Sequence, residues 1–111
     1  MTTFNTFKEL FTDSQPYAGI QDIHHRGFRI SRYCMLTSVT GGHIPALTVM
    51  PSPALLDAIA DNMLAIDRDS IYFHIVIHED GQAVVYAKYN LIIGSRKFAT
   101  IPASEIPLEG K

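Results

Sequence analysis

The sequence predicts an α+β domain made of two α-β-β-β units, each an antiparallel meander with a helix packed on its apolar face. Three observations support this prediction. Residues 71–92 alternate apolar and polar side chains on both sides of a glycine turn, residues 18–50 contain further alternating segments, and a helix start precedes each set. The repeated order suggests an internal pseudo-repeat, and it leaves open whether the two meanders form one sheet or two.

The length and composition are those of one globular domain. The chain has 111 residues, of which 47% are hydrophobic, so it can bury a core without disulfides or metals. We expect a single domain over residues 1–101. Pro102 and Pro107 lack the backbone donor that a strand ladder needs, so residues 102–111 are predicted to form an extended or disordered C-terminal tail.

A short helix is predicted at the N-terminus. Thr2 or Thr3 can cap it, and Pro16 prevents it from continuing much past Ser14. Its buried stripe, at three-to-four spacing, is Phe4, Phe7, Leu10 and Phe11.

Three strands should follow, at about residues 18–25, 28–39 and 43–50. A two-residue loop at Arg26-Gly27 places His24 opposite Arg29 and Asp22 opposite Ser31, although arginine is a poor choice where φ is positive. A two-residue loop at Gly41-Gly42 sets two further pairs, Leu36 with Leu47 and Cys34 with Val49.

Ser52-Pro53 predicts the start of the second helix, because serine can accept from free amides and proline fits the first helical position. We expect this helix over residues 53–66. Its predicted buried stripe is Leu56, Ile59, Ala60, Met63 and Ile66, and its predicted outward residues are Asp57, Asp61 and Asn62.

The hairpin of residues 71–92 has a register that its turn can fix. A three-residue loop, Glu79-Asp80-Gly81, with Gly81 in the left-handed region, puts all the apolar side chains on one face. The predicted pairs are Ile77 with Ala83, Ile75 with Val85, Phe73 with Ala87 and Ile71 with Tyr89. A two-residue loop would mix the two faces, so we favour the longer one. A turn at Gly94-Ser95 then starts a last strand that ends near Ile101.

The net charge and the cysteine content limit the classes of function that we expect for this protein. The formal charge of −2, with 18% charged residues, gives no global positive field that would attract nucleic acid or an anionic membrane. No apolar run approaches the roughly 20 residues that span a bilayer. The single cysteine, Cys34, favours a reducing compartment and a buried thiol. We therefore expect a cytoplasmic protein with no metal or cofactor, since the five histidines are not spaced as ligands.

The outer face of the second hairpin is the main candidate contact surface. Tyrosines bring large apolar area with a polar tip, and valines opposite each other would leave an apolar centre inside a polar rim. The candidate contact residues are Tyr72, His74, Val76, Val84, Tyr86 and Lys88. These residues predict a small non-enzymatic interaction module, such as an adaptor, inhibitor or accessory factor, that binds a protein partner or a second copy of itself.

Two alternatives remain open at this stage. The segment HHRGFRISRY interleaves basic and aromatic residues, and Arg26, Arg29, Arg32 and Tyr33 could hold a nucleic acid by phosphate contacts and stacking. The second alternative is a small-ligand or enzymatic site near His24 and Arg32. Asp22, His24 and Ser31 would lie close together in the predicted register. Arg32 is unusual, because strand alternation places it on the same face as core residues. A strand bulge, an edge position or a salt bridge would explain a charged residue there.

Overall fold

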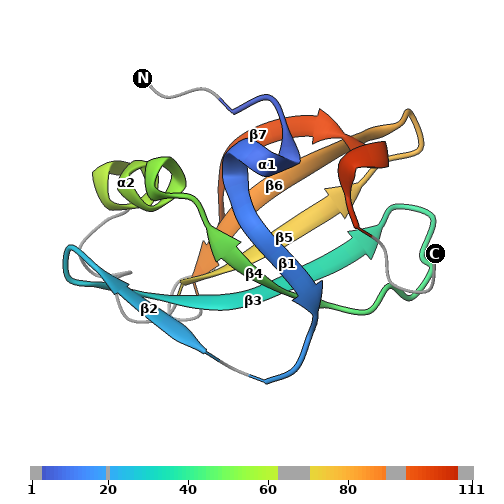
Figure 1. Cartoon of the computed structure of the whole chain (residues 1–111). Coiled ribbons are helices and arrows are strands. Elements are labelled where there is room, and N and C mark those ends of the chain that lie inside the picture. Colours follow the sequence, from blue (N-terminus) through green and yellow to red (C-terminus); the bar gives the residue numbers. More distant parts are fainter. Residues whose placement is uncertain (1–3, 20, 63–70, 90–94, 108–111) are drawn as a thin grey trace.

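The computed structural model describes residues 4–19, 21–62, 71–89 and 95–107. In these residues the chain forms a mixed α+β fold with one seven-stranded, mostly antiparallel sheet (Figure 1). The elements are α1 (Phe7–Leu10), β1 (Phe11–Pro16), β2 (Asp22–His25), β3 (Phe28–Ser38), β4 (Leu47–Pro51), α2 (Pro53–Asn62), β5 (Ile71–Ile77), β6 (Gln82–Tyr89), β7 (Ser95–Pro102) and a 3-10 turn, η2 (Ala103–Glu105). The strands follow the order β1-β4-β3-β5-β6-β7, and β2 also pairs with β3. The two meanders therefore form one sheet, joined where β3 and β5 run parallel.

The β5–β6 hairpin confirms the predicted register. Ile77 pairs with Ala83 and Ile71 with Tyr89, and Gly81 has a φ of 87° in the three-residue loop. Asp80 supports this loop because its carboxylate accepts from the Gln82 amide at 3.0 Å. The inward side chains are fully buried, at 0–1% exposure: Ile71, Phe73, Ile75, Ala83, Val85 and Ala87.

The β2–β3 hairpin also has the predicted register, with His24 opposite Arg29 and Asp22 opposite Ser31. The predicted β3–β4 register is wrong by two residues, because Cys34 pairs with Leu47 instead of Val49. The strand β4 begins only at Leu47, so the connection is longer than the Gly41-Gly42 turn alone. A shift of two keeps each side chain on its predicted face, and Leu36, Leu47 and Val49 are all buried.

The N-terminal prediction was only partly right. The helix α1 is a single turn capped by Thr6, whose side chain accepts from the Glu9 amide while the Glu9 carboxylate accepts from the Thr6 amide. Phe11, predicted as helical, is instead the first residue of β1, which pairs with β4. Phe4 lies before the helix and forms a parallel bridge with Ala99 of β7. The predicted stripe is nevertheless buried throughout.

The helix α2 starts where predicted. Ser52 Oγ accepts from the Leu55 amide at 3.1 Å and donates to the Glu9 carbonyl at 2.7 Å, so one side chain ties the end of α1 to the start of α2. Ile59 is buried as predicted, but the other buried residues of the helix are Leu55 and Ala58, whereas the predicted Leu56 and Ala60 are only partly buried. Met63 and Ile66 of the predicted stripe and Gly94 of the predicted turn lie outside the described residues.

The buried side chains of both halves form one continuous cluster. Phe11 of β1 packs edge-on against Phe73 of β5, with ring centroids 5.2 Å apart. Because β4 and β3 separate these strands in the sheet order, the contact crosses the core and the sheet must curve around it (Figure 1). Figure 1 shows α1 between the start of β1 and β7.

The pseudo-repeat is not confirmed. Among the described residues, the first unit contains the additional strand β1, so the two units differ in strand number there. Residues of the predicted tail also pack against the domain: Ile106 is 6% exposed, and the Glu105 carboxylate accepts from the Phe7 amide at 2.7 Å. In the described part of the chain, no helix has the length and hydropathy needed to cross a membrane.

Candidate functional site

The outer side of β3, β5 and β6 carries a row of half-exposed aromatic and aliphatic residues that we call the tyrosine face. Strand pairing assigns its members, because paired residues point to the same side of a sheet. Its residues are Tyr33, Met35, Thr37, Tyr72, His74, Val76, Val84, Tyr86 and Lys88, bordered by Tyr17 and by Lys97 of β7. All six residues predicted for the contact surface belong to it, and all six are half-buried.

The rings of the tyrosine face contact one another across strands. The Tyr17 and Tyr33 centroids are 5.2 Å apart with the rings edge to face, and those of Tyr33 and Tyr72 are 6.1 Å apart. His74 and Tyr86 form another pair at 6.4 Å. Tyr17 is 40% exposed, which makes it one of the two exposed large hydrophobic residues in the described part of the chain. These contacts order the rings without removing them from solvent.

His74 lies near the centre of the tyrosine face. Its Nε2 atom hydrogen-bonds with Thr37 Oγ1 at 2.8 Å, which orients the ring. Burial lowers the pKa of His74, and the positive charge of nearby Lys88 lowers it further. The neutral imidazole is therefore favoured, and the centre of the face stays uncharged at neutral pH.

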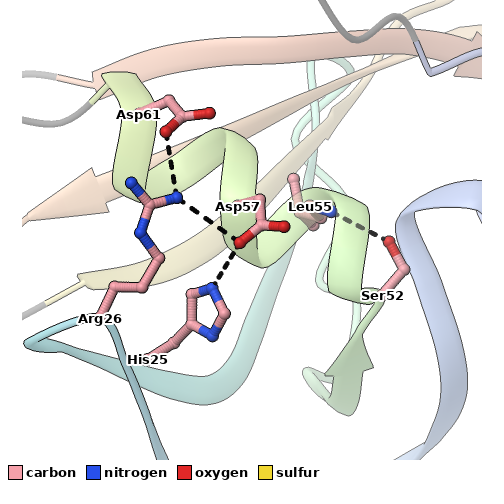
Figure 2. Close-up of polar contacts among 6 residues, drawn as sticks. All are labelled: His25, Arg26, Ser52, Leu55, Asp57 and Asp61. Atoms are coloured by element: carbon pink, nitrogen blue, oxygen red, sulfur yellow. Dashed lines mark hydrogen bonds and ion pairs between the residues drawn. The ribbon is translucent and has the colours of Figure 1, made fainter.

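The predicted nucleic-acid residues do not gather on one surface. Arg26 occupies the β2–β3 turn with a φ of 52°, a left-handed conformation that is costly for arginine. Its guanidinium extends toward α2, where Nη1 lies 3.0 Å from Asp61 and 3.5 Å from Asp57 (Figure 2). His25 donates from Nε2 to the same Asp57 carboxylate at 2.8 Å. This hydrogen bond is the main cause that lowers the pKa of Asp57. The cluster attaches the hairpin to α2.

Arg29 and Arg32 are also engaged. Arg29 Nε lies 3.8 Å from the Asp22 carboxylate. Arg32 lies between Ile30 and Cys34, where the β3–β5 register shifts, and this interruption of the ladder accounts for a charged residue at a position where simple alternation predicts a buried one. Its Nε donates to the Val49 carbonyl at 2.9 Å and its Nη1 donates to the Gln21 side chain. Arg32 therefore joins β3 to β4 and to Gln21, the residue before β2. Of the predicted nucleic-acid residues, Tyr33 is the one that lies on the tyrosine face.

The hairpin that would carry the predicted ligand site near His24 has the predicted register, but His24 itself is exposed. Asp22 and His24 are exposed on β2, and Ser31 Oγ accepts from the Tyr33 amide at 3.1 Å. A pocket of about 600 Å³ does exist, but it lies beside α1 and β1 and is lined by residues such as Phe7, Phe11 and Glu105. Neither His24 nor Arg32 lines it. Among the described residues, no three His, Cys, Asp or Glu side chains are placed to hold a metal ion.

Sequence reasoning missed part of the tyrosine face. Met35 and Thr37 alternate with the buried Cys34 and Leu36, so their outward direction could have been read from the sequence. That β3 runs beside β5, and so brings Tyr33 to Tyr72, depends on a parallel pairing that no local signal specifies.

Comparisons with family models, with curated proteins and with solved structures found no match to this chain.

Proposed function

We propose that the protein is a small non-enzymatic interaction module that binds a protein partner, or a second copy of itself, through the tyrosine face. The observation that carries this proposal is the cross-strand cluster of half-exposed rings around an apolar centre, where Val76 pairs with Val84. Tyrosine is enriched at binding hot spots because it combines large contact area with a hydrogen-bonding tip.

The alternatives have weaker support. The three arginines of residues 24–33 bind carboxylates, a carbonyl and an amide of the same protein, so a nucleic acid would have to displace these contacts. An enzymatic site near His24 would need a shielded pocket, whereas His24 is exposed. We also propose a reducing, cytoplasmic location, since the single cysteine is fully buried in the core and has no disulfide.

The test is partner capture by the unmodified protein and by a Tyr72→Ala, Tyr86→Ala variant. Affinity purification from the native cell, with identification of what copurifies, and sedimentation of the pure protein would cover both a heterologous partner and a second copy. Loss of two hot-spot tyrosines is expected to weaken binding at least 30-fold, equivalent to about 2 kcal/mol. Circular dichroism would establish that the variant remains folded.

The matched control is the double variant Tyr72→Phe, Tyr86→Phe, which keeps the rings and should retain most of the binding. If a folded alanine variant captures the same partner, or self-associates to the same degree as the unmodified protein, the tyrosine face is not the contact surface.

A further inference from the structure

Acidic residues are absent from the strands that form the tyrosine face. None of the 11 Asp and Glu residues of the protein lies in β3, β5, β6 or β7, although the formal charge of the whole chain is −2. The same four strands contain five arginines and lysines: Arg29, Arg32, Lys88, Arg96 and Lys97. The negative charge is therefore placed elsewhere, including α1, α2, the β5–β6 turn and η2.

One of these cations, Lys88, belongs to the tyrosine face, and a second, Lys97, lies at its border. Lys88 pairs with Tyr72 in the β5–β6 ladder, and Lys97 pairs with Tyr86 in the β6–β7 ladder. Within the described part of the chain, neither lysine forms an ion pair, in contrast to Arg26 and Arg29. The surface thus combines an apolar, aromatic centre with two lysines, on β6 and β7, that have no ion-pair partner among the described residues.

Building on the proposed function, we infer that the partner surface is a protein segment that carries Asp or Glu beside aromatic or aliphatic side chains. Carboxylates opposite Lys88 and Lys97 would complement the border, and the apolar side chains would cover Val76 and Val84. A like-charged, lysine-rich segment would be rejected by the same border.

A protein segment fits this face better than a single-stranded nucleic acid. A nucleic acid carries a phosphate at every nucleotide and is held by a groove of cations that follows its backbone. On the tyrosine face the two lysines lie on β6 and β7, while the Val76–Val84 pair and the half-buried aromatic side chains occupy the rest of the surface. An apolar centre with few border charges is the composition of a protein contact.

The test uses fluorescence anisotropy with four labelled probes of known chemistry. These are a random copolymer of glutamate and tyrosine, polyglutamate, a random copolymer of lysine and tyrosine, and an oligothymidylate. We expect the glutamate–tyrosine copolymer to bind most tightly, with an affinity that falls as salt is raised. Equal or tighter binding of polyglutamate, of the lysine copolymer or of oligothymidylate would overturn the inference.

Charge reversal assigns the binding to the lysines. The Lys97→Glu variant changes an exposed side chain and is expected to fold; with Lys88→Glu it should weaken copolymer binding by about tenfold or more. The matched control for the single Lys97→Glu variant is Lys8→Glu, which makes the same charge change at an exposed position on α1 and should leave binding unchanged. Equal effects at Lys8 and Lys97 would show that only net charge matters and would also overturn the inference.

The outcome is separable from that of the proposed function. If no copolymer binds, yet the Tyr72→Ala, Tyr86→Ala variant still loses its cellular partner, the acidic-segment inference fails and the proposed contact surface stands. If the alanine variant keeps its partner, the proposed function itself fails.

Discussion

Replacing Arg32 by alanine tests the most unusual residue of the sheet. Arg32 Nε donates to the Val49 carbonyl at 2.9 Å in a part-buried position, and its Nη1 donates to the more exposed Gln21 side chain. A hydrogen bond from a charged group contributes about 1.5–3 kcal/mol, and the orphaned Val49 carbonyl would not regain full solvation. Because the Gln21 contact is exposed, we count it only in part. The Arg32→Ala variant should therefore lose about 2–3 kcal/mol of unfolding free energy.

The measurement is urea denaturation followed by circular dichroism, with an unchanged slope showing that the same surface unfolds. Arg32→Lys keeps the positive charge but cannot donate two hydrogen bonds in the geometry of a guanidinium. It should therefore lose less unfolding free energy than Arg32→Ala. Arg96→Ala is the matched control, because Arg96 is exposed on β7 and its loss should cost less than about 0.5 kcal/mol. A similarly small effect for Arg32→Ala would refute the view that this side chain joins β3 to β4.

Three further predictions concern the turn, the tyrosine face and the core. Gly81→Ala should destabilise the protein by about 1–2 kcal/mol, because φ is 87° there although space is open; Gly42→Ala, also in open space but without a positive φ, should be close to neutral in the same urea assay. Because the pKa of His74 is lower in the folded protein than in the unfolded chain, the unfolded chain takes up a proton on His74 first as the pH falls. The free energy of unfolding should therefore decrease as the pH drops below about 6.5. A His74→Gln variant should show a shallower fall in that window, and identical pH profiles would contradict the assignment. Burial raises the pKa of Cys34, so a thiol reagent should label it only after unfolding; rapid labelling of the native protein would show that the site opens.

The hairpins were predictable because their determinants are local. In β5–β6, strict alternation and a glycine in a three-residue loop agree on one register, so both faces of the hairpin followed from the sequence. In β2–β3 the two-residue turn was correctly placed despite Arg26, whose ion pairs with α2 help to hold its left-handed backbone. The helix start at Ser52 was likewise a local signal.

The errors lie where distant segments decide the structure. Phe4, Phe7, Leu10 and Phe11 have helical spacing, but β4 pairs with the chain from Phe11 onward and makes it a strand. The position of β3 beside β5, and hence most of the extent of the tyrosine face, also depends on a pairing between segments separated by a helix. Such pairings set the surface that a partner meets, which explains why sequence reasoning found the β5–β6 part of the face but not its β3 part.

The first and last elements of the fold support each other. Phe4 is bridged to Ala99, and the Phe7 amide donates to Glu105, a residue 98 positions later. During synthesis, Phe4 and Phe7 would therefore lack these two contacts until β7 and η2 had left the ribosome. Closing so long a loop is entropically costly, so we expect slow, all-or-none folding in which residues 4–7 are among the last of the described residues to become protected from proteases.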